Sequence, residues 1–394
     1  MRELSIYLHI PFCVRKCGYC DFLSFTSGKQ DIDKYHALLL REVRMLAPLY
    51  REHKVISVFI GGGTPSLLPG EKIEELLALL RSSFTFAASV EITIEVNPGT
   101  VTEEKLLFYK KAGINRLSIG LQSARDEELR LLGRIHDYRT FLYTYELARQ
   151  TGFTNINIDL ISALPGQTPD DWLYTLNRVV ALSPEHISAY SLILEEDTWF
   201  YEHRKELDFP DEEQDRLLYE LTERVLSKSG YRRYEISNYA KEGFTCIHNQ
   251  VYWTRGDYAG FGLGAASLVE NVRWHNPAGL NIYEEKLNLY EESLNTGNNM
   301  RNTVSRTAVG EDVQYLSIEE QIEEYMFLGL RLMQGVSRKE FMRQFGCSME
   351  SVYGAVMEKL LKDGLIQNIG LDRIGLTRYG IDISNYVMAQ FLLI

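Results

Sequence analysis

Three cysteines lie close together near the start of the chain, at Cys13, Cys17 and Cys20. Three and then two residues separate successive thiols, so one short loop can wrap all of them around a single metal centre. Thiolates are the usual ligands of iron–sulfur clusters, and they are normally presented as such a group. Three ligands on a cubane cluster leave one iron without a protein ligand. The sequence therefore predicts a [4Fe–4S] cluster with an open coordination site.

A structural zinc ion is the main alternative for these cysteines. A zinc site of that kind uses four protein ligands, and no CxxC pair lies nearby to complete it. His9 is a candidate fourth ligand, but it lies at the end of an apolar, strand-like stretch. The two remaining cysteines, Cys246 and Cys347, are far along the chain, and the total of five is odd. This usage does not describe a disulfide-stapled secreted domain.

Length and composition limit the class of protein. The chain has 394 residues, 45% of them apolar, which is ample for a buried core and excludes disorder for the bulk of it. The net charge of −12 argues against sequence-independent nucleic-acid binding, which needs a basic surface. No apolar run approaches the roughly 20 residues of a membrane helix. Residues Met1–Ser5 lack a signal-peptide pattern. We expect a cytoplasmic protein without a nucleic-acid partner.

Strand-like and helix-like segments alternate over the first half of the chain. The predicted strands are Leu4–Ile10, Val55–Ile60, Val90–Val96, Arg116–Leu121, Asn155–Ile161 and Ile187–Leu194, and the predicted helices between them are Asp33–Leu46, Ile73–Leu80, Glu103–Ala112, Phe141–Thr151 and Asp170–Leu182. Repeated strand–helix alternation favours a parallel sheet with right-handed crossovers. The predicted fold class is α/β, a partial (β/α)6 barrel of the triosephosphate-isomerase type, open on one side.

Polar or glycine-rich features follow the predicted strands at one end. They are the cysteine loop, Gly61–Pro65, Glu95, Gly120–Ser123 and Asp159. Each has a structural explanation by itself, since Gly61–Gly63 suits a loose turn and Asn97–Gly99 is a sequence typical of turns. Chemistry in such barrels lies at the carboxyl ends of the strands, so together these features predict one site at the barrel mouth.

The chain is predicted to contain three parts. Residues 1–200 form the barrel, 201–310 a central extension, and 311–394 a winged-helix-like module of three helices, a hairpin over 365–376 and a final apolar segment. In the central extension, the glycine-rich run Gly260–Ser267 is interpreted as close backbone packing, because a bare GxGxG is weak evidence for a nucleotide site. The first helix of the last module, Ile318–Met333, carries four glutamates, which favours a packing or interaction role over DNA binding.

The cysteine loop and three further motifs resemble those of a known protein family. The CxxxCxYC loop after a first strand resembles the radical S-adenosylmethionine (SAM) superfamily. Tyr7–Cys13, Gly61–Pro65 and Asn157–Ile161 are similar to the group of the oxygen-independent coproporphyrinogen III oxidase, over almost the whole chain. Within that group the chain is most similar to the HemW family of heme chaperones. Phe22 stands where the oxidase has a fourth cysteine, no extension precedes the first strand, and residues 248–253 read HNxxYW, the heme-binding motif of that family.

The resemblance implies a cofactor site. Cys13, Cys17 and Cys20 would hold the [4Fe–4S] cluster, and its open iron would bind the amino and carboxylate groups of SAM. The SAM contacts implied for this chain are Tyr7, Phe22, Gly62, Gly63, Thr64, Glu95, Gln122, Arg134 and Asp159. Glycine suits close approach of backbone to a charged group, and the fork of an arginine suits a carboxylate. Taken singly, Arg134 also reads as a solvated helix-end residue, Asp159 as a turn cap and Tyr7 as inward packing.

The resemblance also implies a heme site. His248 is the candidate axial ligand, Tyr252 and Trp253 offer aromatic faces to the macrocycle, and Asn249 offers a hydrogen bond. The alternative is a satisfied interior cluster of the same side chains. Cys246 is a second candidate ligand, for which a buried thiol is the favoured interpretation.

Three functions remain open at the level of sequence. The first is a heme chaperone that delivers heme to acceptor haemoproteins, with membrane-bound respiratory proteins among the candidates. The second is an oxygen-independent coproporphyrinogen III oxidase, which would cleave SAM with an electron from a donor such as flavodoxin or ferredoxin; Phe22 counts against it, and enzyme activity is left open. The third is an interaction protein with a vestigial cluster site, which the intact ligand set disfavours.

Overall fold

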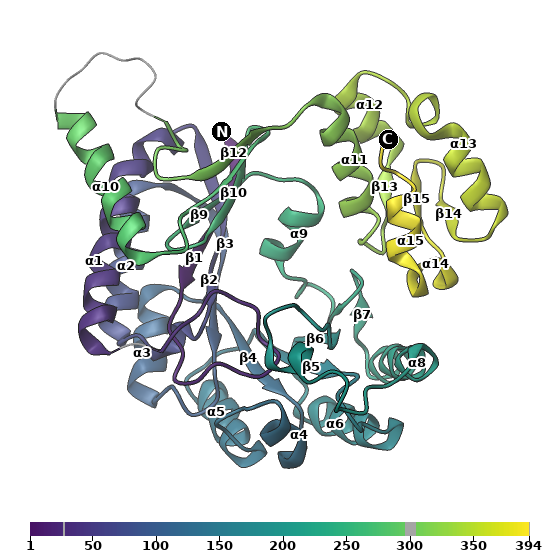
Figure 1. Cartoon of the computed structure of the whole chain (residues 1–394), viewed down its shortest axis with the longest axis horizontal. Helices are drawn as coiled ribbons and strands as arrows, with labels where there is room; N and C mark the ends of the chain where they lie inside the picture. Colours follow the sequence, from purple (N-terminus) through teal and green to yellow (C-terminus); the bar gives the residue numbers. More distant parts are fainter. Residues whose placement is uncertain (27, 296–304, 394) are drawn as a thin grey trace.

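One large sheet organises most of the molecule. The structure is a computed structural model that describes residues 1–26, 28–295 and 305–393. Its barrel strands are β1 (Arg2–Ile10), β2 (His53–Gly62), β3 (Thr85–Val96), β4 (Arg116–Gln122), β5 (Ile156–Ser162) and β6 (His186–Ser191). They pair in parallel in chain order, from β1 through β6, and curve into an open barrel (Figure 1). The predicted partial barrel is confirmed.

Helices connect these strands on the outer side of the sheet. They are α1 (Lys29–Leu46), α2 (Gly70–Ser83), α3 (Glu103–Ala112), α4 (Asp126–Leu131), α5 (Tyr138–Gln150) and α6 (Pro169–Leu182), and short 3-10 turns follow α1 and β2. Local chemistry fixes where several begin. Thr102 and Asp137 each accept a backbone N–H in the first turn, and Thr168 forms a capping box ahead of Pro169. Five of these six helices are predicted from sequence; α4 is not.

The central segment adds strands to both edges of this sheet. Its elements are α7 (Trp199–Glu202), α8 (Glu212–Lys228), β7 (Arg232–Arg233), β8 (Asn238–Ala240), α9 (Ile247–Trp253), β9 (Tyr258–Phe261), β10 (Ala266–Val269), β11 (Val272–His275), α10 (Leu280–Asn295) and β12 (Glu311–Tyr315). The full order is β12-β11-β10-β9-β1-β2-β3-β4-β5-β6-β8-β7. Strand β9 runs parallel to β1, and β8 pairs antiparallel with β6. Residues 296–304 of the predicted extension lie outside the described residues.

The glycine-rich run beside β9 packs closely against its neighbours. A Cβ at Gly260 would lie 2.3 Å from the carbonyl oxygen of Ala266, so a larger residue would push β9 away from the turn into β10. The Gly260 N–H donates to Ser267 Oγ at 2.9 Å. This confirms the interpretation of the run as close backbone packing.

A second, separate hydrophobic core lies in the C-terminal part. Its elements are α11 (Ile318–Gly329), β13 (Val336–Ser337), α12 (Arg338–Phe345), α13 (Met349–Lys362), β14 (Ile366–Ile369), β15 (Arg373–Leu376), α14 (Arg378–Asp382) and α15 (Ser384–Ala389). Three helices and the predicted hairpin are present, with β13 completing a three-stranded sheet. Helix α11 ends earlier than predicted, because Leu332 pairs with Glu235 of the central segment. Ile394 lies outside the described residues.

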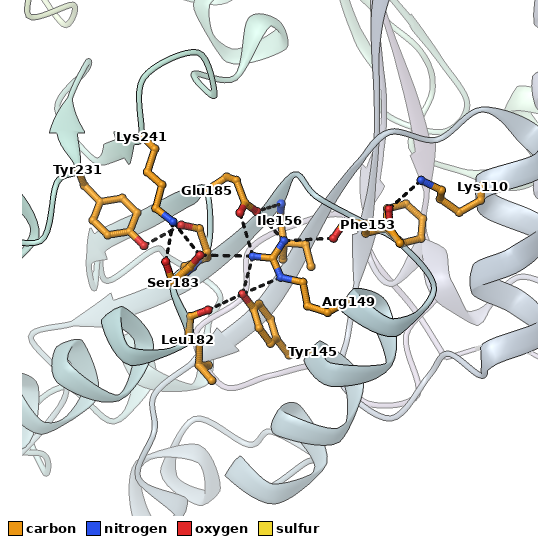
Figure 2. A network of polar contacts seen from close by, with 12 residues as sticks. Lys110, Tyr145, Arg149, Phe153, Ile156, Leu182, Ser183, Glu185, Tyr231 and Lys241 are labelled. Atoms are coloured by element: carbon orange, nitrogen blue, oxygen red, sulfur yellow. Dashed lines mark hydrogen bonds and ion pairs between the residues drawn. The ribbon is translucent and has the colours of Figure 1, made fainter.

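A polar network ties α5 to the amino ends of β5 and β6 (Figure 2). The Nη1 and Nη2 atoms of Arg149 donate to the two carboxylate oxygens of Glu185 at 2.8 and 3.0 Å. The same carboxylate accepts the N–H of Ile156 at 3.0 Å. Beside it, Lys241 donates to the carbonyl and hydroxyl oxygens of Ser183. The network lies at the amino ends of these strands, opposite the predicted site.

Candidate cofactor site at the barrel mouth

A cavity of about 390 Å³ lies at the carboxyl ends of the barrel strands. The predicted residues that line it are Cys13, Cys17, Cys20, Phe22, Gly62, Gly63, Thr64, Glu95, Gln122, Arg134 and Asp159. Asn97, Ser118 and Tyr190 line it as well. The structure thus brings residues from the ends of all six barrel strands into one cavity, as expected of a barrel of this type.

The cysteine loop connects β1 to α1 and is anchored at both of its sides. The Cys13 N–H donates to the carbonyl of Phe25 at 3.1 Å, and the Gly18 N–H donates to that of Leu132 at 3.1 Å. All five cysteines of the chain are free thiols. Burial raises the pKa of the Cys20 thiol to about 11, and the neighbouring Cys17 and Cys13 add to that shift. The three thiols therefore lie within electrostatic range of one another on one wall of the cavity.

The zinc alternative needs a fourth protein ligand, for which His9 is the candidate. Among the residues that the structure describes, no three His, Cys, Asp or Glu side chains converge on a point where one metal ion would sit. A cubane [4Fe–4S] cluster does not require its ligands to converge on one point, because each cysteine binds a different iron. His9 is also engaged: its Nδ1 lies 3.0 Å from the Tyr7 hydroxyl, and its Nε2 lies 2.9 Å from the carbonyl oxygen of Leu23.

Each of the three sulfurs has a hydrogen-bonding partner. Thr64 Oγ1 lies 3.4 Å from Cys13 Sγ, and Arg134 Nη1 donates to Cys17 Sγ at 3.7 Å. The backbone N–H of Phe22 donates to Cys20. Cluster-ligating thiolates are negatively charged acceptors, and such bonds are among the means by which proteins adjust a cluster. Three thiols with three donors on one cavity wall fit a [4Fe–4S] cluster.

The glycine segment at the end of β2 allows the cofactor wall to form. Gly62 has a φ of 114°, which side-chain-bearing residues rarely adopt, and a Cβ there would lie 2.6 Å from the His9 ring. A Cβ at Gly63 would lie 2.8 Å from the carbonyl oxygen of Phe12. The Gly62 N–H donates to Glu95 Oε2 at 3.0 Å. The segment therefore couples the cysteine loop to the carboxylate at the end of β3.

Two partly buried carboxyl groups line the cavity. Burial and the charge of Asp159 raise the pKa of Glu95 to about 8. Burial likewise raises the pKa of Asp159, although its oxygens accept from Asn157 Nδ2 at 2.7 Å and from Ser118 Oγ at 3.0 Å. A cation placed between them would restore the charged forms. SAM carries a sulfonium and an ammonium group, so these carboxyls suit it.

Arg134 supplies the complementary positive group. Its Nη2 donates to the carbonyl of Gly120 at 2.9 Å, whereas its buried Nε has no hydrogen-bond partner among the described residues. The forked guanidinium of a cavity-lining arginine suits a ligand carboxylate. Gln122 nearby has a φ of 73°, an uncommon backbone state for a residue with a side chain. The donor set fits SAM, whose reductive cleavage to a carbon-centred radical is the chemistry that such a site supplies when loaded.

Tyr7 is the one predicted SAM contact that does not line the cavity. Its hydroxyl lies 3.0 Å from His9 Nδ1, and its ring lies 6.4 Å from both the Phe59 and the His248 rings. Burial and Glu95 raise its pKa well above the ordinary value. Tyr7 thus lies beneath the cavity, between the cofactor site and α9.

His248, the candidate heme ligand, lies inside the molecule. It is 2% exposed, with its ring stacked on Phe59 at 5.1 Å. Its Nδ1 lies 2.9 Å from Ser57 Oγ, and its Nε2 lies 2.9 Å from the Tyr252 hydroxyl. Burial lowers the pKa of His248 to about 3, so the ring is neutral. Both nitrogens are engaged in this conformation, and ligation of iron requires one of these bonds to break.

The rest of the HNxxYW motif lies where α9 meets the barrel and the C-terminal part. The guanidinium of Arg331 lies 4.3 Å from the centre of the Trp253 ring. The Asn249 N–H donates to Cys246, which is fully buried and lies 3.5 Å from Glu91 Oε1. The favoured interpretation of Cys246 as a buried thiol is thereby supported. In this conformation both ring nitrogens of His248 are hydrogen-bonded inside the protein, whereas Trp253 Nε1 has no hydrogen-bond partner among the described residues. The motif therefore matches only in part the satisfied interior cluster that the sequence left open.

Asn97 is the main residue of the site that sequence reasoning missed. In the sequence, an asparagine before Pro98 is typical of a turn. In the structure, its Nδ2 donates to Thr64 Oγ1 at 2.8 Å, and its Oδ1 accepts from Arg134 Nη2 at 2.7 Å. The available signal was its place two residues after Glu95, at the end of a barrel strand.

The fold and this site define a radical SAM protein. Residues 7–179 match the radical SAM superfamily, and residues 316–383 match the HemN C-terminal domain. The structure resembles coproporphyrinogen III oxidase (HemN) from Escherichia coli, a radical SAM enzyme, with a TM-score of 0.83 and 27% identity, covering 99% of this chain and 90% of that one.

Sequence comparison narrows the assignment. The heme chaperone HemW of Bacillus subtilis is 36% identical over 391 residues, which is 98% of this chain and 99% of that protein. The heme chaperone HemW of Escherichia coli is 34% identical over 397 residues, covering 99% and 98%. The chain belongs to the HemW family.

Proposed function

We propose that this protein is a heme chaperone: it binds heme and delivers it to acceptor haemoproteins, with a [4Fe–4S] cluster and SAM held at the barrel mouth. The observation that carries the proposal is the similarity to proteins named heme chaperone HemW along the full length of the chain. Two local features support it, namely the HNxxYW motif on α9 and Phe22 in place of the oxidase's fourth cysteine.

The residues divide between two ligands in this proposal. Cys13, Cys17 and Cys20 hold the cluster, and the SAM contacts are the cavity residues together with Tyr7 beneath them. The residues that bind heme do so after α9 shifts, because His248 is enclosed in the protein; they are His248, Asn249, Tyr252 and Trp253. The proposed division of the chain remains 1–200, 201–310 and 311–394.

The proposed location is the cytoplasm, with acceptors that include membrane-bound respiratory proteins. Within the described ranges, no helix is long and apolar enough to cross a membrane. An electron donor such as flavodoxin or ferredoxin is required only if SAM is cleaved.

Oxygen-independent coproporphyrinogen III oxidase activity is the second candidate. It is supported by the likeness to HemN and by the completeness of the cluster and SAM residues around the cavity. Oxidative decarboxylation of the substrate propionates would follow from SAM cleavage. The exposed Phe22 at the motif's fourth position counts against it.

A paired assay on one anaerobically reconstituted sample separates the two functions. Heme-loaded protein is mixed with an apo-haemoprotein, and transfer is followed by absorbance. The same preparation is incubated with SAM, dithionite and coproporphyrinogen III. We expect heme transfer and no protoporphyrinogen IX; formation of that product at a catalytic rate would refute the chaperone assignment.

The role of His248 is tested by His248→Ala. We expect weaker heme binding or a shifted Soret band, with His275→Ala, a histidine on a partly exposed strand, as the matched control. Thermal denaturation accompanies both, because His248→Ala also removes two buried hydrogen bonds, at a cost of about 2 kcal/mol. An unchanged Soret band and affinity in a folded variant would exclude His248 as the iron ligand.

A further inference from the structure

The side chain of Asn97 is hydrogen-bonded to two of the three groups that reach the sulfur atoms of the three cysteines. Thr64 approaches Cys13, and Arg134 approaches Cys17. Asn97 lies between them, bonded to Thr64 at 2.8 Å and to Arg134 at 2.7 Å. The result is a continuous chain of contacts from Cys13 through Thr64, Asn97 and Arg134 to Cys17.

The chemistry of the groups fixes the direction of every bond in this chain. A guanidinium only donates, so the atom of Asn97 that faces Arg134 must be Oδ1. The amide nitrogen then faces Thr64 and donates to Oγ1. A threonine hydroxyl has one hydrogen and two acceptor positions. Because its oxygen accepts from Asn97, the Thr64 hydrogen is left for Cys13 Sγ, which carries no hydrogen when it binds iron.

Asn97 is held rigidly enough to impose this direction. Its backbone N–H donates to Ser66 Oγ at 3.1 Å, and its carbonyl accepts from the Thr100 hydroxyl at 2.6 Å. It directly follows β3, and the next residue, Pro98, restricts the backbone conformation of Asn97 itself. A polar side chain fixed at a strand end positions its partners more sharply than one on a free loop.

We propose that Asn97 is a positioning residue that directs hydrogen bonds to Cys13 and Cys17 and thereby raises the reduction potential of the cluster. Reduction adds negative charge to the cluster and its thiolates, and donors aimed at the sulfurs stabilise that charge. The inference rests on the cluster site of the proposed function. An aspartate of the same shape would not serve, because its carboxylate accepts from both neighbours and turns the Thr64 hydrogen away from Cys13.

The test is the midpoint potential of the reconstituted cluster, measured without SAM by a mediated dithionite titration followed by EPR. Thr64→Val removes the hydroxyl, and Asn97→Asp reverses its direction. Each is expected to lower the ratio of reduced to oxidised cluster at a fixed potential by up to about tenfold, which for one electron is about 59 mV. Thr64→Ser keeps the hydroxyl and is expected to keep the potential of the unaltered protein.

The double variant separates hydrogen-bond direction from added charge. If Asn97 acts through Thr64, most of the shift caused by Asn97→Asp disappears in the Thr64→Val background, since neighbours in one network are not additive. A shift of equal size in both backgrounds overturns the proposal, because it is then an effect of the carboxylate charge alone. Unchanged potential in Thr64→Val overturns it as well.

Two measurements keep this outcome distinct from failure of the cluster site. Iron and sulfide content is determined first: an unaltered protein that assembles no cluster contradicts the proposed function itself. Asn115→Asp is the matched control, because Asn115 is exposed at the opposite end of the barrel, where it bonds to Val90 and Ile92. It is expected to leave the potential unchanged. If Asn97→Asp assembles no cluster, the comparison of Thr64→Val with Thr64→Ser still decides.

Discussion

At the scale of single residues, burial sets the electrostatic state of the site before any ligand arrives. Glu95 and Asp159 lie close together in a cavity whose positive group, Arg134, is already engaged with Gly120, Asn97 and a cysteine. With its pKa near 8, Glu95 is mostly protonated at neutral pH. A cationic ligand is therefore coupled to the loss of a proton.

This coupling predicts a pH dependence for SAM binding. Only ionised Glu95 attracts the cation, so the affinity should rise as the pH increases toward about 8 and level off above it, by at most about tenfold per pH unit. Glu95→Gln should bind more weakly with a flatter profile, whereas the exposed Glu104→Gln should not differ from the unaltered protein. Calorimetry between pH 6 and 9 measures this; parallel profiles for Glu95→Gln and the unaltered protein would contradict it.

The raised pKa of Glu95 gives the stability of the ligand-free protein the opposite pH dependence. A carboxyl whose pKa is raised from 4.5 to about 8 contributes stability that is full below its unfolded pKa. That contribution is lost as the pH rises through about 8. Ligand binding and folding therefore favour opposite protonation states of Glu95.

The residues that sequence alone could assign are those whose type is unusual for their place. Three thiols in one loop, and Glu95 or Asp159 at the end of an apolar strand, have few structural explanations. Asn97 was missed because asparagine before proline is ordinary in turns. Its role depends on Thr64 and Arg134, which are distant in sequence, and only the fold brings them together.

At the scale of elements, the predictable part of the fold is the part with long, regular patterns. The six barrel strands and five of their helices follow from hydrophobic periodicity. The edge strands do not, because β7 to β12 are only two to five residues long, and the pairings that attach them to the barrel, β9 with β1 and β8 with β6, join residues far apart in sequence. Helix α9 is likewise too short for a periodic signal, and its burial results from tertiary packing.

The network in Figure 2 joins α5 to the amino ends of β5 and β6, and a substitution in it measures how much it stabilises the fold. Glu185 is 14% exposed and receives two bonds from Arg149 and one from Ile156. In Glu185→Gln, an amide NH2 group replaces one of the two oxygens that accept N–H groups, so two donors face each other. We expect the free energy of unfolding to fall by about 2 kcal/mol. Urea denaturation measures this.

The control for that substitution is an exposed pair on α4. Arg130 and Glu127 are 3.7 Å apart, and both side chains are about 70% exposed. Glu127→Gln should change the free energy of unfolding by no more than about 0.5 kcal/mol. Equal effects of the two substitutions would mean that the Glu185 network adds nothing beyond an ordinary surface ion pair.

At the scale of the whole molecule, α9 connects three parts. It contacts β2 through His248 and Ser57, follows β8 in the chain, and contacts α11 of the C-terminal part (Figure 1). Its first turn is held by Glu91, which accepts the N–H groups of Ile247 and His248. Any movement of α9 that frees the heme motif must therefore also loosen the contact with α11.

An ion-pair cluster beside α9 fixes that contact. Glu324 of α11 accepts from Arg255 Nε and Arg273 Nη1, both at 2.8 Å, and the Arg255 and Glu324 side chains are 5% and 8% exposed. Removing the carboxylate leaves Arg255 buried without its partner, which costs about 3–5 kcal/mol. Of the four glutamates on α11, this one thus supports the packing role expected for the module.

Glu324→Gln should therefore release α11 from α9 while each hydrophobic core stays folded. We expect faster amide hydrogen exchange in α9 and α11, with β2 to β5 unchanged, because local opening precedes global unfolding. We also expect faster heme binding if movement of α9 limits access to His248. Glu319→Gln, exposed on the same helix, is the control. Unaltered exchange in α9 of Glu324→Gln would show that this ion pair does not hold the two parts together, and unaltered heme association despite faster exchange would show that heme reaches the protein without displacing α9.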